Sequence, residues 1–247
     1  PAPEPESLNP LCEVVRQLHA DIGIAYDGDG DRMVVVDEEG VLAPLDETLA
    51  AYASYLVKER GRGVVVTTVE ASMCLEKMIE PMHGKVVRTK VGDVEVATAV
   101  KGHEAVFGGE PCGAWIHPQH HYCPDGILSS ILLLKALEDE NKTLSSFVSE
   151  VPRYPILREK TPCPSRAKSV VMEDLEKTLP SLFREIEEKL TIDGVRILLK
   201  NGWILVRPSG TEPLIRVTVE AENAKEAESI MEKGLRQVKK SVEGVIK

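Results

Sequence analysis

Short β-branched runs alternate with amphipathic segments through the first 150 residues of the chain. The run at 64–69 is continuous, which is typical of a strand buried on both faces of a sheet. Between such runs, apolar residues recur at helical spacing, as at Leu49, Tyr52, Ala53 and Leu56. This alternation predicts an α/β domain with a mainly parallel sheet. The expected elements are helices at 11–18, 46–60, 72–80, 93–100 and 125–140, and strands at 21–26, 33–37, 64–69, 85–89 and 105–107.

The pattern changes after a proline-rich stretch at 151–164, which predicts a domain boundary. Beyond it we expect a helix over 172–189, a hairpin that turns at Asn201-Gly202 into a strand over 203–206, and a final helix over 224–240. These elements predict a small α+β domain. In the first part of the chain, Asp46 and Asp125 stand where an N-cap is expected.

Residues 26–32, Tyr-Asp-Gly-Asp-Gly-Asp-Arg, lie between two expected strands and place three carboxylates within five positions. Asp27, Asp29 and Asp31 alternate with glycines, which adopt positive φ angles readily. Hard divalent cations such as Mg²⁺ prefer oxygen ligands, so the spacing predicts a metal site at a strand end. One alternative is a solvated acidic hairpin turn, because Asp-Gly is common in hairpins. An EF-hand is disfavoured, because no Glu stands at the twelfth position and the flanks resemble strands.

A second motif, Arg207-Pro-Ser-Gly-Thr-Glu-Pro213, directly follows the expected strand at 203–206. Arg207 offers a bidentate fork, Ser209 and Thr211 offer hydroxyls, and Gly210 leaves backbone N–H groups accessible to an anion. This donor set favours a phosphate site. The alternative is a plain Pro-Ser-Gly turn between strands.

Three further features have weaker signals. Glu110, in Gly108-Gly-Glu-Pro-Cys-Gly113, has the surroundings of a carboxylate that accepts hydrogen bonds from sugar hydroxyls, although an ordinary glycine-rich turn has the same composition. Asp93 follows an expected strand and is a candidate N-cap. A group of side chains suggests a transition metal but lacks zinc-type spacing. Its members are His117, His120, His121, Tyr122, Cys123 and Asp125.

Composition narrows the classes of partner. The chain has 247 residues and a formal net charge of −10, which argues against broad contact with nucleic acid or acidic membranes. No apolar run approaches the length of a membrane span, and no signal peptide is evident. The five cysteines are scattered without CxxC spacing, so we expect reduced thiols and a cytoplasmic location.

Three motifs, at 27–32, 108–113 and 207–213, resemble in order and spacing those of the α-D-phosphohexomutase family, which includes phosphoglucosamine mutases, phosphomannomutases and phosphoglucomutases. The resemblance covers essentially the whole chain. It implies three parts of a four-domain protein. Residues 1–41 would be the end of domain two, an α/β domain, with the metal loop. Residues 42–152 would be a complete α/β, sugar-binding domain with a mainly parallel mixed sheet, and 153–247 a smaller α+β, phosphate-binding domain.

The resemblance also implies roles for individual residues. Mg²⁺ would be held by Asp27, Asp29 and Asp31, and Arg32 would face the reacting phosphate. The expected contacts with substrate are Glu110, Cys112 and Asp93 on the sugar, and Arg207, Ser209, Gly210 and Thr211 on the phosphate that is not transferred. Cys112 stands where many members have Ser. Ala114 replaces a His found in many members, so no general acid or base is assigned. The Gly92-Asp93 pair resembles the glucosamine-type enzymes and favours glucosamine phosphate, with mannose or glucose phosphate as alternatives.

The family's reaction moves phosphate between O1 and O6 of a hexose through a bisphosphorylated sugar. Its nucleophile is a phosphoserine in a Thr-Ala-Ser-His-Asn-Pro-like motif of domain one, and this chain contains no such motif. The chain also begins with Pro1 and not with Met. We therefore expect the C-terminal part of a mutase, inactive alone, with the missing N-terminal domains and a hexose phosphate as its partners; a homo-oligomer stays open. The alternatives are a non-catalytic sugar-phosphate binding module and a metal-dependent phosphatase.

Overall fold

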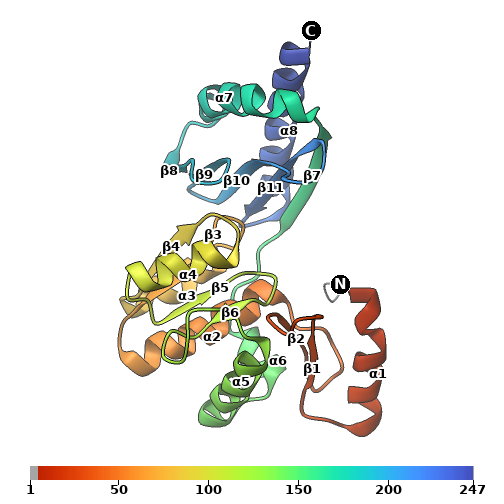
Figure 1. Ribbon diagram of the computed structural model, residues 1–247, viewed down its shortest axis with the longest axis vertical. Coiled ribbons are helices and arrows are strands. Elements are labelled where there is room, and N and C mark those ends of the chain that lie inside the picture. The colour runs from red at the N-terminus through yellow and green to blue at the C-terminus, as the bar shows by residue number, and fades with distance from the viewer. Residues whose placement is uncertain (1–4, 247) are drawn as a thin grey trace. The chain divides into compact units, whose positions relative to one another are not determined.

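The computed structural model describes residues 5–246 (Figure 1). The chain divides into two compact units, Pro1–Arg153 and Tyr154–Lys247. Each unit has its own sheet and its own buried core, and each is described here by itself.

The first unit opens with a short 3₁₀ helix, η1 (Pro5–Leu8), and helix α1 (Asn9–Leu18). Strands β1 (Gly23–Tyr26) and β2 (Met33–Val36) then form an antiparallel hairpin in which Tyr26 pairs with Met33. Helix α1 packs Cys12 and Val15 against Val36 of β2. The acidic segment 27–32 is therefore the connection of this hairpin, which we call the metal loop.

A four-stranded sheet forms the centre of the first unit, in the order β4-β3-β5-β6. Strand β3 (Val64–Thr68) runs parallel to β4 (Lys85–Thr89) and β5 (Phe107–Gly109), and β6 (Trp115–Ile116) runs antiparallel to β5. The expectation of a mainly parallel mixed sheet is confirmed. The accompanying helices are α2 (Leu45–Arg60), α3 (Cys74–Ile79), η2 (Glu80–Met82), α4 (Asp93–Gly102), α5 (Gly126–Glu140) and α6 (Leu144–Ser149).

Helices cover both faces of this sheet (Figure 1). Successive strand residues point to opposite faces. A side chain at Gly108 would meet Val100 of α4, whereas one at Gly109 would meet Leu49 of α2. Helices α4 and α2 therefore lie on opposite faces, and this unit has α/β/α layers.

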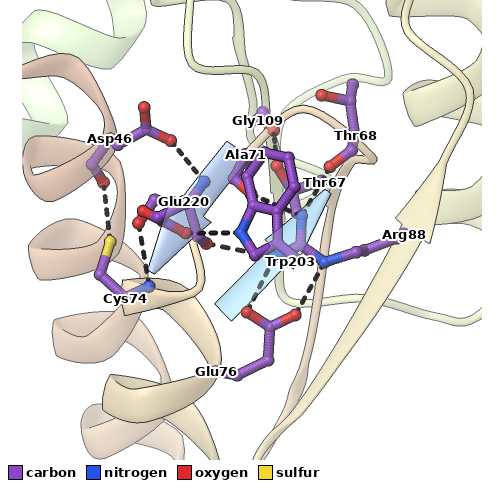
Figure 2. A network of polar contacts seen from close by, with 11 residues as sticks. Asp46, Thr67, Thr68, Ala71, Cys74, Glu76, Arg88, Gly109, Trp203 and Glu220 are labelled. Carbon is purple, nitrogen blue, oxygen red and sulfur yellow. Dashed lines mark hydrogen bonds and ion pairs between the residues drawn. The ribbon is translucent and has the colours of Figure 1, made fainter. Parts of the chain in front are cut away.

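The connection from β3 to α3 is fixed by Arg88 of β4 (Figure 2). The Arg88 guanidinium is 5% exposed, binds both carboxylate oxygens of Glu76 at 2.8 Å, and donates to the carbonyls of Thr68 and Ala71. Asp46 contributes from α2 by accepting a 2.8 Å hydrogen bond from the Ser72 amide. The expectation that Asp46 caps α2 is wrong, because the helix begins one residue earlier, after Pro44.

Aromatic side chains pack the side of the sheet that faces α2. Tyr52 stacks on Trp115 with ring centroids 4.9 Å apart, and Phe107 meets Trp115 edge-on. His117 joins this cluster, is 1% exposed, and has its Nε2 2.9 Å from Ser129 Oγ. Burial lowers the pKa of His117 to about 4, so the ring is neutral at physiological pH.

The second unit is an antiparallel sheet in the order β7-β11-β10-β9-β8, with two long helices. Its elements are β7 (Ile156–Pro162), η3 (Ser165–Ala167), α7 (Lys168–Thr178), η4 (Pro180–Leu182), β8 (Ile186–Leu190), β9 (Val195–Leu199), β10 (Gly202–Pro208), β11 (Leu214–Ala221) and α8 (Ala224–Ile246). Trp203 is fully buried, and its indole N–H donates to Glu220 on the neighbouring strand. The expected small α+β fold is confirmed.

One expectation for this unit is wrong. The helix expected over 172–189 ends at Thr178, and residues 186–190 form edge strand β8. Pro180 cannot continue the helix, and the charged side chains of β8 suit a solvated sheet edge as well as a helix face. The proline-rich stretch at 151–164 does contain the division between the two units, after Arg153. It also contains β7, which tolerates prolines because it is an edge strand.

Helix α8 is the longest helix, at 23 residues. Neither it nor any other helix among residues 5–246 is both long and apolar enough to cross a bilayer.

The buried His117 generates a prediction about acid stability. The folded-state pKa of His117, about 4, lies below the unfolded value of 6.5, so below pH 6.5 the unfolded chain binds a proton that the folded chain does not. The contribution of His117 to the free energy of unfolding is therefore fully present above pH 6.5 and is lost as pH falls toward 4. The loss should reach about 3 kcal/mol of unfolding free energy. Denaturant unfolding between pH 7 and 4 should show a steeper pH dependence in the natural chain than in His117→Gln. The exposed His103, replaced by Gln, is the matched control, and equal slopes for all three proteins would contradict the assignment.

Candidate functional site

The metal loop brings its three carboxylates together. One oxygen each from Asp27, Asp29 and Asp31 lies within 4.8 Å of the others. Gly30 has the expected positive φ, 76°, but Gly28 does not. The loop is thus a hairpin connection in which three carboxylates converge, which is the geometry that the predicted metal site requires.

Asp27 organises the loop from inside. Its carboxylate is 1% exposed and accepts hydrogen bonds from the Gly30 amide at 3.1 Å, the Arg32 amide at 3.2 Å and Arg32 Nε at 2.6 Å. Burial opposes ionisation of this carboxylate, but the hydrogen bonds from Arg32 outweigh it and lower the pKa of Asp27 to about 2. Asp27 is therefore ionised throughout the physiological range.

For Asp31, the effects that disfavour the ionised carboxylate prevail. Burial and the charges of Asp27 and Asp29 raise its pKa. Its Oδ1 is buried and accepts no hydrogen bond from the described residues, and the nearest cationic atom, Arg32 Nε, is 3.4 Å away. An all-oxygen donor set in which three carboxylates converge, and in which one buried oxygen accepts no hydrogen bond, fits a hard divalent cation such as Mg²⁺.

Two glycine contacts hold the metal loop between neighbouring segments. Met33 N donates to Gly113 O at 3.1 Å, and Gly126 N donates to Gly30 O at 2.9 Å. A side chain at Gly113, where φ is 90°, would lie 2.0 Å from the Met33 carbonyl, and one at Gly126 would lie 2.8 Å from that of Arg32. The metal loop therefore contacts both residues 108–113, which we call the Glu110 loop, and the start of α5.

Helix α5 begins with the expected cap. The Asp125 side chain accepts a 2.8 Å hydrogen bond from the Leu128 amide, which confirms that prediction. The capped helix places Gly126 against the metal loop.

The Glu110 loop also contacts the turn that precedes α4. Glu110 is 8% exposed, and its Oε2 accepts a 3.2 Å hydrogen bond from the Gly92 amide. Gly92, with φ 132°, is the residue before α4, so Asp93 is the first residue of the helix, exposed to solvent, and does not cap it. Burial of the Cys112 thiol raises its pKa, although the residue as a whole is exposed, and Glu110 and Arg32 are close enough to influence it. The first unit thus gathers the metal loop, Glu110, Cys112 and the Gly92-Asp93 turn.

The Arg207 loop belongs to the second unit, where it connects β10 to β11. Arg207 is the penultimate residue of β10, and its Nε is 3.0 Å from Asp193 Oδ2. The Ser209 amide donates to Leu214 O at 3.0 Å, and the Ser209 hydroxyl accepts from the Glu212 amide at 3.2 Å. The turn between the strands is therefore closed by its own hydrogen bonds.

Gly210 and Thr211 form the exposed tip of this loop. Gly210 does not have a positive φ, and a side chain there would meet nothing within 4 Å. The local backbone conformation therefore does not require glycine at position 210. The glycine leaves open space beside the backbone.

Sequence reasoning missed Lys168, the first residue of α7. Its ammonium donates to the carbonyls of Ser209 at 2.6 Å and Glu212 at 2.5 Å. Because a trans peptide directs its N–H opposite to its carbonyl, the Gly210 N–H faces away from Lys168. A lysine at the start of a helix resembles any solvated charge, so no sequence signal marks this contact.

The side chains of the histidine-rich segment do not bring three potential ligand atoms together. Within residues 5–246, the acidic triplet of the metal loop is the one group of three or more His, Cys, Asp or Glu side chains whose ligand atoms converge. His117 is bound to Ser129 in the core.

Comparisons with known proteins agree with this geometry. Three models of the phosphoglucomutase/phosphomannomutase family match the chain, alpha/beta/alpha domain II at 1–40, alpha/beta/alpha domain III at 44–154 and the C-terminal domain at 162–236. The phosphoglucosamine mutase of Methanocaldococcus jannaschii is 46% identical over 246 residues, a match that covers 98% of this chain and 54% of that relative. The chain spans about half the length of the curated relatives it matches.

Solved structures share the fold. A phosphoglucomutase/phosphomannomutase family protein from Burkholderia thailandensis has a TM-score of 0.83 at 23% identity, covering 96% of this chain and 50% of that one. Aspergillus fumigatus N-acetylphosphoglucosamine mutase, solved in complex with GlcNAc-6P and magnesium, has a TM-score of 0.63 at 19% identity, covering 94% and 53%. With three consecutive domains matched along its length, the chain belongs to the phosphoglucomutase/phosphomannomutase family.

Proposed function

We propose that this chain supplies the metal, sugar and phosphate sites of a phosphohexomutase that moves phosphate between O1 and O6 of glucosamine phosphate through a bisphosphorylated sugar. The observation that carries the proposal is the convergence of Asp27, Asp29 and Asp31 beside the Glu110 loop in a member of this family. Mannose phosphate and glucose phosphate are the alternative substrates.

Asp27, Asp29 and Asp31 would hold Mg²⁺, which supplies positive charge to a phosphoryl group in transfer. Arg32 would act beside it. Its Nε donates a hydrogen bond to Asp27, and its two Nη groups have no partner among the described residues. They are available to pair with phosphate oxygens in the fork geometry that guanidinium groups favour.

Glu110 and Asp93 would recognise the sugar. The Gly92 amide orients Glu110, whose carboxylate accepts hydrogen bonds from hydroxyl groups. Asp93 is exposed at the start of α4, where its carboxylate would pair with the ammonium group of glucosamine. This charge pairing, together with the phosphoglucosamine mutase activity named for the relative from Methanocaldococcus jannaschii, supports an amino sugar.

The Arg207 loop would hold the phosphate that is not transferred. Arg207 offers its fork, Ser209 and Thr211 their hydroxyl protons, and the Gly210 amide faces the open side of the loop. Lys168 would keep that amide in place from behind.

The phosphoryl donor would come from the N-terminal domains, because the family's serine motif does not occur in this chain. We propose that the chain has no mutase turnover by itself. A cytoplasmic location is likewise proposed, and it is supported by five cysteines that are all free thiols.

The first prediction here concerns the metal. Asp29 is exposed and makes no contact that the fold requires, so Asp29→Asn should fold normally yet bind Mg²⁺ at least tenfold more weakly, about 1.4 kcal/mol. Isothermal titration with MgCl₂ measures the change. Asp21→Asn, which removes an exposed carboxylate outside the metal loop, should bind as the natural chain does. Equal affinity in all three proteins would refute the metal assignment.

The second prediction concerns the phosphate clamp. Arg207→Ala should weaken binding of glucosamine 6-phosphate or inorganic phosphate by about 2 kcal/mol, the scale of a charge-assisted hydrogen bond. Arg207→Lys should recover part of the loss, because an ammonium lacks the fork. Lys168→Met should also weaken binding, through the released Gly210 amide. Calorimetry tests each variant against Arg236→Ala, which removes an exposed arginine of α8. Unchanged affinity in Arg207→Ala would identify the loop as an ordinary turn.

The third prediction tests the function itself. With Mg²⁺ and a hexose 1,6-bisphosphate, the chain alone should not convert glucosamine 6-phosphate to the 1-phosphate, whereas addition of a polypeptide that carries domain one and the rest of domain two should restore conversion. Turnover by the chain alone would overturn the donor assignment. Release of phosphate without isomer exchange would favour a phosphatase, and binding without restored conversion would favour a binding module.

A further inference from the structure

The segment between β6 and α5 contains a thiol, an imidazole and a carboxylate in sequence-local contact. Cys123 Sγ lies 3.1 Å from His121 Nδ1, and His121 Nε2 lies 3.2 Å from Asp125 Oδ2. Cys123 is exposed to solvent. A nucleophile in contact with a base, which a third group orients in turn, is the arrangement that activates side chains for attack.

The carboxylate end of this arrangement is fixed by the fold. Asp125 uses Oδ1 to cap α5 through the Leu128 amide, and its own amide donates to Trp115 O at 3.1 Å. Its second oxygen, Oδ2, is the one that faces His121. The helix cap therefore sets the direction from which the imidazole is held.

The contacts of His121 suit a proton acceptor. When Nε2 carries the proton and donates it to Asp125, the Nδ1 lone pair faces the Cys123 thiol. After Nδ1 takes the thiol proton, the imidazolium can donate to Asp125 and also to the Cys123 carbonyl, which is 3.0 Å from Nδ1. Both ring nitrogens then have acceptors, and the positive ring lies beside the thiolate.

We propose that Cys123 is a site of thiol–disulfide exchange with low-molecular-weight disulfides, in which His121 is the proton acceptor and Asp125 is the positioning residue. The thiol proton moves to His121 Nδ1, and the thiolate attacks one sulfur of the disulfide. A new S–S bond forms at Cys123 while the original S–S bond breaks. The departing thiolate takes the proton from the imidazolium, so one disulfide and one thiol yield a mixed disulfide and a new thiol.

The chain contains its own reference thiol. Cys112 is also exposed, but burial of its sulfur raises its pKa, which reduces the thiolate fraction. Cys12, Cys74 and Cys163 are buried and should not compete. Reaction at Cys123 is thus measurable against Cys112 within one molecule.

The test is a time course of the whole chain with oxidised glutathione at pH 7, with each cysteine quantified by peptide mass spectrometry. Cys123 should acquire glutathione at least tenfold faster than Cys112. In His121→Gln the Cys123 rate should fall to near that of Cys112, while the Cys112 rate stays unchanged. Asp125→Asn, which keeps a helix-capping oxygen but removes the charge, should give an intermediate Cys123 rate.

Two outcomes would overturn the proposal. The first is equal rates at Cys123 and Cys112 in the natural chain, a comparison that needs no variant to fold. The second is a Cys123 rate that His121→Gln leaves unchanged, because the thiol would then react through its exposure alone.

Discussion

The ion pair between the buried Asp27 carboxylate and the partly exposed Arg32 guanidinium is the contact on which the first unit's site depends. Asp27 is almost fully withdrawn from water, and an ionised carboxylate there is tolerated because three donors satisfy it, two from Arg32 and one from Gly30. These bonds curl the chain between β1 and β2 so that Asp29 and Asp31 come back toward Asp27. Removing Arg32 would leave the buried Asp27 charge without its main partner. Arg32 therefore stabilises the folded loop, whatever further role it has.

Close backbone contacts then connect that loop to the rest of the unit. Gly113 and Gly126 approach the chain around Met33 and Arg32 so closely that no side chain fits at either position. Backbone contacts therefore fix the relative positions of three segments: the metal loop, the Glu110 loop and the start of α5. These contacts do not depend on flexible side chains. The phosphoryl transfer proposed for this site would benefit from such rigidity, because that reaction depends chiefly on positioning and charge neutralisation.

Sequence-local features of this protein were predictable, and long-range ones were not. The convergence of Asp27, Asp29 and Asp31 follows from alternate residues in one short turn, and the Asp125 cap from the apolar helix behind it. The parallel sheet follows from alternating helices and β-branched strands. By contrast, β7 and β8 are edge strands whose composition resembles a linker and a helix, and only their pairing with β11 and β9 identifies them. Lys168 acts 41 and 44 residues away, on carbonyls that carry no side-chain signature.

Lys168 also adds positive charge to the second unit near the Arg207 loop. The phosphate proposed for the Arg207 loop would have to approach a chain with net charge −10, and Arg207 lies 3.0 Å from Asp193 while Arg216 is paired with Glu212. The two guanidinium charges are therefore largely offset by carboxylates. Lys168 has no carboxylate partner among the described residues and is bound instead to the Ser209 and Glu212 carbonyls. It thus adds an uncompensated positive charge directly behind the loop, and the same two hydrogen bonds that orient the Gly210 amide outward keep that charge in place.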